Sequence, residues 1–255
     1  MKPKVTKVVF SPGGSVKGIS DLFCTFAGWE GAEELDLLRR RDFRGKTFQR
    51  DEIAVVAAPV FFGRIPEIVA QKLRDVKGDS TPAIAMVVYG NRDYEDALIE
   101  LADLLTANGF VLHGAGTFAA RHSIYPKIAE DRPDERDKEA LRAFALHCAE
   151  NIKKGGPLAA SIKGNRPYRP YGRIPFYPKG DSRCTACGLC AKTCPVAAID
   201  ERTPRLTDKK LCINCTACIN VCPENARSYS GLLYKIGGMK LKRACSEYRE
   251  PEIFL

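Results

Sequence analysis

The chain has 255 residues, a formal net charge of +9 and eleven cysteines. Its length suffices for two domains with a sizeable core. No apolar run is long enough to cross a membrane, and the start, MKPKVTKVVF, lacks a signal-peptide pattern. We therefore expect a cytoplasmic protein with free thiols and no membrane span. The basic excess lies after residue 152. We interpret the arginines and tyrosines there as those of a linker that lies on the domain surfaces, and we expect no nucleic-acid partner.

Five segments have the composition of β-strands, at residues 4–10, 34–38, 53–58, 83–89 and 110–114. Helical patterns alternate with them, at about residues 15–27, 67–73, 93–107 and 134–154. The run IAVVAA at residues 53–58 is continuously apolar, as in a strand buried on both faces. Strands that alternate with helices predict a parallel sheet with helices on both sides.

The pattern changes after residue 154. Residues 155–180 are rich in Pro, Gly, Tyr and Arg and predict a linker. The cysteine motifs follow in residues 181–230, and residues 231–255 predict a helix or arm that packs back on the body. We therefore predict an α/β domain at 1–154, a linker at 155–180, a cysteine-rich domain at 181–230 and a C-terminal extension at 231–255.

Eight of the cysteines form two runs of the type C-x₂-C-x₂-C-x₃-C-P, one beginning at Cys184 and the other at Cys212. Three thiolates at this spacing wrap one [4Fe–4S] cluster, while the fourth, beside a proline, serves the other cluster. Zinc sites instead use pairs of cysteines with a longer loop between them, so we favour iron–sulfur clusters over zinc. We assign the ligands of cluster 1 and cluster 2 as follows: Cys184, Cys187, Cys190 and Cys222 for cluster 1; Cys212, Cys215, Cys218 and Cys194 for cluster 2.

The spacings of residues 184–223 resemble those of bacterial two-cluster ferredoxins. That resemblance implies a small α+β ferredoxin-like domain with pseudo-two-fold symmetry, which exchanges single electrons. The three other cysteines, Cys24, Cys148 and Cys245, have no ligand-spaced neighbour, and we expect buried, inert thiols.

Three loops follow predicted strands at the carboxyl edge of the sheet, where doubly wound folds bind ligands. They look like the FMN-contacting loops of flavodoxins, and the similarity covers residues 4–152. It implies a flavodoxin-like doubly wound sheet of five strands in the order 2-1-3-4-5. The residues that it implies as FMN contacts are Ser11, Gly13, Gly14, Ser15 and Val16; Pro59, Val60, Phe61, Phe62 and Gly63; and Tyr89, Gly90, Asn91 and Tyr94.

The first of these loops departs from the flavodoxin pattern. Flavodoxin phosphate loops read close to S/T-x-T-G-x-T, whereas here Gly13 and Val16 replace two hydroxyl residues. Each lost hydrogen bond to a charged group costs about 1 kcal/mol or more. The alternative therefore stays open that the N-terminal domain binds no FMN and serves as a docking surface.

The order of the two parts resembles bacterial flavodoxin–ferredoxin fusion proteins over nearly the whole chain. The resemblance implies an electron-transport iron–sulfur flavoprotein that passes single electrons between two [4Fe–4S] clusters and FMN. The alternative is an oxidoreductase, a flavin-dependent reductase of a small molecule supplied by the clusters, so the chain is either a carrier or an enzyme. Its basic surface suits an acidic redox partner protein, and the oligomeric state is left open. In the segment 114–123, His122 either contacts the flavin or a substrate or is a surface or capping histidine; we expect the second.

Overall fold

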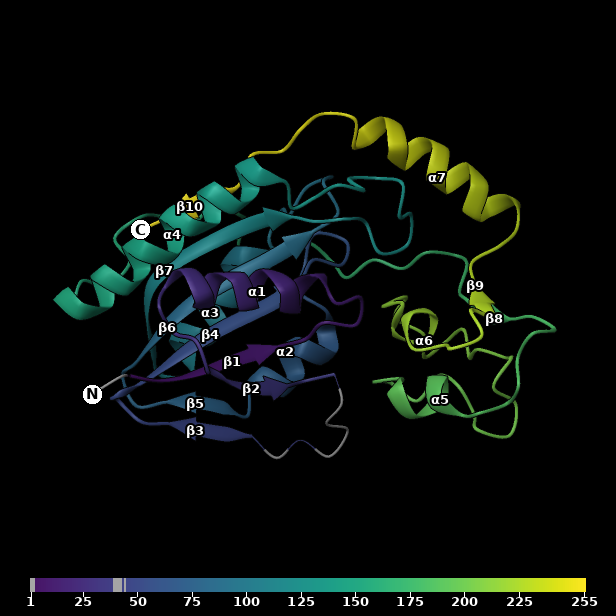
Figure 1. Cartoon of the computed structure of the whole chain (residues 1–255), viewed down its shortest axis with the longest axis horizontal. Coiled ribbons are helices and arrows are strands. Elements are labelled where there is room, and N and C mark those ends of the chain that lie inside the picture. The colour runs from purple at the N-terminus through teal and green to yellow at the C-terminus, as the bar shows by residue number, and fades with distance from the viewer. Residues whose placement is uncertain (1–2, 39–42, 44) are drawn as a thin grey trace.

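The computed structural model describes residues 3–38, 43 and 45–255. Its centre is a six-stranded sheet in the order β10-β7-β6-β4-β1-β2 (Figure 1). These strands are β1 (Lys4–Val9), β2 (Glu33–Asp36), β4 (Glu52–Pro59), β6 (Thr81–Tyr89), β7 (Phe110–Ala119) and β10 (Glu252–Phe254). The first five pair in parallel, and β10 is antiparallel to β7.

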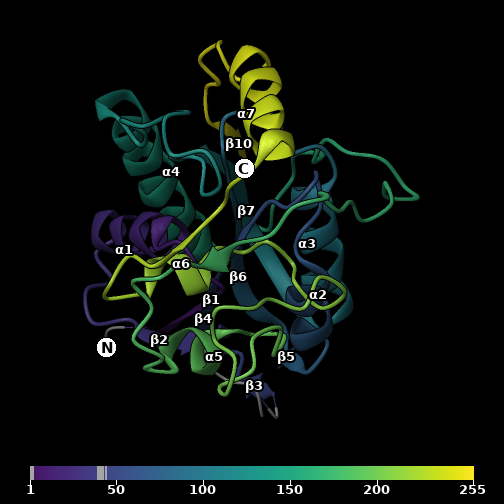
Figure 2. The same ribbon diagram turned by 90° about the vertical axis from the view of Figure 1, so that its right-hand side faces the viewer.

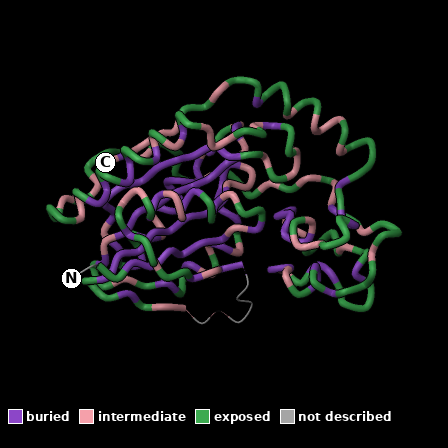
Figure 3. The backbone as a smooth tube through the Cα atoms, in the orientation of Figure 1, coloured by how far each residue is buried: buried purple, intermediate pink, exposed green. Residues whose placement is uncertain are grey.

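Two helices cover each face of the sheet. Helices α1 (Ser15–Phe26) and α4 (Glu135–Lys154) pack on one face, and α2 (Glu67–Leu73) and α3 (Ala97–Ala107) pack on the other. Strand β4 shows why both faces need cover. Its residues are all buried and alternate between the two cores, with Val55 in one and Val56 in the other. A strand of this kind must lie between two helical layers, and Figure 3 shows the buried backbone gathered there.

The parallel strands have the predicted order, and the flavodoxin-like fold is confirmed. Three boundaries were wrong. Strand β7 continues to Ala119, so residues 114–119 belong to the strand and do not form a loop after it; α3 begins at Ala97 and not near residue 93; and β2 ends at Asp36 and not at residue 38. A second small pair, β3 (Lys46–Phe48) with β5 (Val76–Gly78), was not predicted because three residues show too little periodicity. Within the described residues, no helix combines the length and hydropathy of a membrane span.

The cysteine-rich part lies beyond the carboxyl ends of the parallel strands (Figures 1 and 2). It consists of two short helices, α5 (Leu189–Thr193) and α6 (Ala217–Asn220), and one small antiparallel pair, β8 (Lys179–Gly180) with β9 (Arg227–Ser228). Helix α7 (Leu232–Ala244) then leads the chain back, and the last residues form β10 on the edge of the main sheet. The predicted returning arm is thus a helix followed by an edge strand.

Strand β10 fixes the C-terminal extension through a core contact. Phe254 is 8% exposed and belongs to the hydrophobic core beneath α2 and α3, whereas Leu232 at the start of α7 is 71% exposed. We predict that Phe254→Ala lowers the free energy of unfolding by about 3 kcal/mol, because it leaves a cavity. The control Leu232→Ala should change it by less than about 0.5 kcal/mol. Urea unfolding of the anaerobic, cluster-loaded protein measures both, and equal effects would show that β10 does not anchor the extension.

Candidate functional site

A cavity of about 390 Å³ lies at the carboxyl edge of the sheet and is called the edge cavity below. The loops after β1, β4, β6 and β7 form its floor and sides, and its size is in the range of small-molecule sites. Ten of the residues predicted to contact FMN line it: Gly13, Ser15, Val16, Pro59, Val60, Phe61, Phe62, Gly63, Tyr89 and Gly90. The structure therefore brings the three predicted loops together around one space.

Four predicted contact residues lie outside the edge cavity. Ser11 Oγ accepts the backbone N–H of Lys17 at 2.9 Å, and Gly14 is the left-handed residue before α1. Tyr94 is buried below the cavity, with its ring edge-on to that of Tyr89.

Asn91 is the fourth, and it holds the C-terminal extension. Its side-chain NH₂ donates to the carbonyl oxygens of Cys245 and Glu247 at 3.0 and 2.9 Å. These contacts come from a segment more than 150 residues away in the sequence, and no local sequence pattern predicts them. The amide side chain is therefore unavailable to a ligand in the edge cavity.

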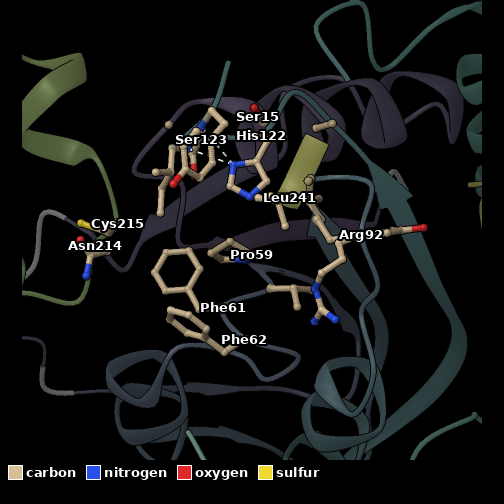
Figure 4. A pocket seen from close by; sticks show the side chains of 18 of the residues that line it. Ser15, Pro59, Phe61, Phe62, Arg92, His122, Ser123, Asn214, Cys215 and Leu241 are labelled. Atoms are coloured by element: carbon tan, nitrogen blue, oxygen red, sulfur yellow. Dashed lines mark hydrogen bonds between the residues drawn. The ribbon is translucent and has the colours of Figure 1, made fainter. Parts of the chain in front are cut away.

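The aromatic loop after β4 is a tight turn. The backbone N–H of Phe61 donates to Arg64 O at 2.8 Å, and Phe62 and Gly63 both have positive φ, 55° and 78°. A bulky residue rarely adopts this conformation, and such strain is concentrated at functional sites. Figure 4 shows the rings of Phe61 and Phe62 directed into the cavity, where they offer an apolar surface to a flat ligand.

His122 lines the same cavity, and its ring also caps the turn that follows it, as expected of a capping histidine. Its Nδ1 accepts the backbone N–H groups of Ile124 and Tyr125, both at 3.2 Å, so the ring proton sits on Nε2. Burial lowers the pKa of His122 to about 4, which keeps the ring neutral. A Cβ on Gly90 would lie 2.4 Å from His122 Cδ2, so the ring can occupy this place only above a glycine.

The roof of the edge cavity comes from the linker, the cysteine-rich part and α7, whose contributions include Phe176, Cys215 and Leu241. Tyr125 stacks on Tyr234 of α7, with ring centroids 4.8 Å apart. Sequence analysis missed these roof residues because each belongs to a different distant segment. One signal was present: the Gly237-Gly238 pair, where a Cβ would lie within 2.8 Å of Tyr125 and would push α7 away.

The eight motif cysteines surround two smaller cavities. Cluster cavity 1 is lined by Cys184, Cys187, Cys190 and Cys222, and cluster cavity 2 by Cys194, Cys212, Cys215 and Cys218. This is the grouping that crossed ligation predicts, in which the fourth cysteine of each run turns to the other site. Residues 213–215 line both cluster cavity 2 and the edge cavity, so these two sites share a wall.

The 28-residue repeat is also visible in the backbone. Ala186 and Gly188 have φ of 57° and 75°, and their counterparts Asn214 and Thr216 have φ of 57° and 68°. Left-handed residues between the cysteines turn successive N–H groups toward one concave site, a suitable arrangement for an anionic group. After each run, a backbone N–H donates to the fourth cysteine, at 3.2 Å for Cys194 Sγ and 3.3 Å for Cys222 Sγ.

The cluster cavities differ in their exposure. Cys187 is exposed and Cys184 is half-buried, whereas Cys215 and Cys218 are buried. Burial raises the pKa of the Cys218 thiol to about 11 and raises that of Cys215 as well. As free groups these thiols would be neutral, and iron supplies the positive charge that makes them thiolates. The donor set of each cavity, four cysteines with backbone N–H groups around them, therefore fits a [4Fe–4S] cluster.

The cysteine-rich part is tied to the first loop of the sheet. Asn220 Nδ2 donates to Pro12 O at 3.2 Å and to Thr216 O at 3.1 Å, so α6 is joined to the loop between β1 and α1. The same helix carries Cys218. This contact holds cluster cavity 2 next to the edge cavity.

Comparison with known proteins gives a family for the cysteine-rich part. Residues 178–200 and 206–228 each match the family described as 4Fe-4S binding domain. Together with the strand order, this shows that the chain combines an N-terminal flavodoxin-like domain with a 4Fe-4S binding domain. No curated protein matches the chain significantly.

Solved structures resemble the N-terminal domain. They include a flavodoxin from the domain Archaea, with 13% identity over 58% of this chain and 99% of the other, and a TM-score of 0.38. Flavodoxin 1 from Bacillus cereus has 10% identity over 58% and 97%, with a TM-score of 0.41. Rubredoxin oxygen:oxidoreductase from the anaerobe Desulfovibrio gigas has 18% identity over 60% and 37%, with a TM-score of 0.41. The fold assignment rests on the strand order and not on these scores.

The neutral state of the half-buried His122 has a consequence for stability. Its folded-state pKa, about 4, lies below the ordinary value, so the unfolded chain binds a proton first as the pH falls. Stability is therefore lost as the pH falls from about 6.5 toward 4. We predict that the wild type loses about 1 kcal/mol more than His122→Asn between about pH 7.5 and 5.5. Urea unfolding at both values tests this, and parallel losses in the two proteins would contradict it.

Crossed ligation makes a prediction about variants. Cys194→Ala should lose the same cluster as Cys212→Ala, because both thiols line cluster cavity 2, and should keep about four of about eight irons. Cys148→Ala is the control, since that buried thiol lies on α4 and lines neither cluster cavity. Iron analysis and EPR of the reduced proteins provide the measurement. If Cys194→Ala instead reproduces the spectrum of Cys190→Ala, the ligation is not crossed.

Proposed function

We propose that this protein is an electron-transfer iron–sulfur flavoprotein of the cytoplasm, which passes single electrons between two [4Fe–4S] clusters and FMN. The observation that carries the proposal is the shared wall. Ile213, Asn214 and Cys215 separate cluster cavity 2 from the edge cavity and line both. A thiol that would hold a cluster thus borders the place where a flavin would bind.

The edge cavity offers what FMN needs. The loop after β1 leads into the N-terminus of α1, which has no acidic residue in its first turn, and helix N-termini bind phosphate. Phe61 and Phe62 supply an apolar surface for the ring system, and His122 supplies an N–H donor at Nε2. When bound, FMN would accept one or two electrons and so join single-electron carriers to two-electron chemistry.

The order of the sites suggests a direction from the surface inward. Cys187, in cluster cavity 1, is exposed, whereas cluster cavity 2 lies between it and the edge cavity. A partner protein would therefore exchange electrons at cluster 1. The exposed guanidinium of Arg205 donates to Cys184 O at 3.2 Å and gives this surface positive charge, which suits an acidic partner.

The roof of the edge cavity covers part of the proposed flavin site. The linker, α7 and the loop after β7 close over it, and the stacked rings of Tyr125, Tyr234 and Tyr229 hold these segments together. Exclusion of water strengthens the electrostatic influence of nearby groups and limits side reactions.

A flavin-dependent reductase of a small molecule is the second candidate. The specific observation in its favour is the polar side of the edge cavity, where the fixed donor of His122 lies near Arg92 and Arg121. Such a group of donors would orient an anionic substrate. The two proposals differ in outcome, because an enzyme would need a small molecule to reoxidise the flavin, whereas a carrier would need only a partner protein.

The first test is the cofactor content of the anaerobically purified chain. We expect about eight irons, eight sulfides and one FMN per chain, and flavin bleaching together with the clusters when electrons enter from a low-potential donor. Eight irons without flavin, even after added FMN, would reject the flavin proposal and leave a docking role for the N-terminal domain.

A variant tests the edge cavity as the FMN site. Gly90→Ala should weaken FMN binding at least tenfold, about 1.4 kcal/mol, because the new methyl group displaces His122 into the cavity. The matched control is Gly18→Ala, since a Cβ there meets nothing within 4 Å although α1 carries the phosphate loop. Flavin fluorescence titration of both proteins gives the affinities. Unchanged affinity in Gly90→Ala would place FMN elsewhere.

A further inference from the structure

Arg227 is a buried cation between the two cluster cavities. Arg227 is 3% exposed and lines cluster cavity 1. Its charge also acts on the thiols of Cys212 and Cys218, which line cluster cavity 2. Buried arginines are rare without a partner for each donor. The acceptors of the N–H groups of Arg227 therefore indicate what this residue does.

The guanidinium of Arg227 uses part of its hydrogen-bonding capacity on the protein. Its Nη1 donates to Pro204 O, and its Nη2 donates to Pro178 O at 3.1 Å and to Thr207 Oγ1. Its Nε is buried and has no hydrogen-bond partner in the part of the chain that the structure describes. The hydrogen bonds of its two Nη atoms go to oxygen, and the guanidinium also interacts with the Cys218 thiol, where it opposes the rise in pKa that burial causes. An unpaired buried N–H is costly unless a ligand accepts it.

The internal repeat shows that this arginine is a departure from symmetry. Twenty-eight residues earlier, the equivalent position is Ile199, which is buried and lines cluster cavity 2. Each of the two residues follows one cysteine run. Each faces the cavity to which that run contributes only its fourth cysteine. One site has an aliphatic wall at this position, and the other has a cation.

We infer that Arg227 is a cluster-facing residue that raises the reduction potentials of both [4Fe–4S] clusters. The inference rests on the proposed cluster binding, but it does not require FMN. Reduction adds one electron to a cluster and breaks no bond. The guanidinium carries the same positive charge before and after the cluster accepts its electron.

The physical reason is the difference in charge between the oxidised and reduced clusters. A buried positive charge stabilises the more negative, reduced cluster more strongly, and hydrogen bonds to cluster sulfurs act in the same direction. Burial reduces screening by water, so the effect of Arg227 exceeds that of a surface charge. Glu224 also lines cluster cavity 1, but it is exposed and therefore screened.

The experiment compares Arg227→Gln with the wild type in redox titrations followed by EPR. Both proteins are reconstituted anaerobically as full chains, and iron and sulfide are counted first. We expect Arg227→Gln to hold about eight irons and to lower the potential of cluster 1 by 59 mV or more, which is a tenfold change for one electron. The potential of cluster 2 should fall as well.

Arg205→Gln is the matched control. Arg205 is an exposed arginine that donates to Cys184 O at 3.2 Å, so it is close to the same cluster but in contact with water. Its replacement should shift the potential several times less than that of Arg227. Equal shifts in the two variants, or no shift in a fully loaded Arg227→Gln, would overturn the inference and leave Arg227 a structural role only.

A second measurement covers the case in which Arg227→Gln fails to load clusters. The wild type is prepared with ¹⁵N-labelled arginine, and pulsed EPR of the reduced clusters detects nearby nitrogen. We expect a ¹⁵N coupling that persists in Arg205→Gln and disappears in Arg227→Lys. Clusters without such coupling would overturn the inference, whereas a wild type without clusters would reject the proposed cluster binding itself.

Discussion

The antiparallel pairing of β10 with β7 is the constraint on which the arrangement of the two parts depends. The cysteine-rich part leaves the sheet through the linker after α4 and returns through α7 to β10. Because both of its ends are tied to the same sheet, it cannot swing freely at the end of a tether. Phe254 in the core and the contacts of Asn91 with the extension stabilise the return. Together with the contact between Asn220 and Pro12, this attachment at both ends holds residues 213–215 as the wall that the two cavities share.

The outgoing linker is held by a buried charge. Arg64 makes a paired hydrogen bond to Glu100, at 2.6 and 2.7 Å, and its guanidinium lies against the rings of Tyr168 and Tyr171 from the linker. Removal of one partner from a buried ion pair is costly, so the aromatic residues that cover it are fixed as well. The Pro- and Tyr-rich segment therefore serves as one wall of the edge cavity, and its composition reflects packing on a surface.

The two cluster cavities are related by a repeat that is followed closely by the backbone and loosely by the side chains. The positive φ angles recur 28 residues apart, because three ligands on a short loop leave few ways to turn the chain. The walls are free to differ, and they do at Ile199 and Arg227. A duplicated module can in this way keep its ligands while its two sites acquire unequal electrostatic surroundings. Unequal surroundings make the two clusters differ in reduction potential.

The sequence by itself determined the features that depend on near neighbours. The cysteine spacings define two ligand sets because a cluster bridges only a few residues, and the continuous apolar run of β4 marks a strand with two covered faces. The same local logic placed Phe61, Phe62 and Gly90 at the edge of the sheet, since parallel strands end on one side.

Only the tertiary structure decided which of these residues meet across long separations. Asn91 and Tyr94 follow β6, where ligand-binding residues are expected. The side chain of Asn91 instead binds the C-terminal extension, and that of Tyr94 is buried in the core. His122 has no local signature, and it enters the edge cavity because Gly90 leaves room and two backbone N–H groups fix its ring. The place of Cys215 between a cluster and the edge cavity depends on β10, a strand of three residues with no periodicity of its own. Contacts of this kind are set by burial and hydrogen-bond partners from distant segments, which a pattern within a short window cannot contain.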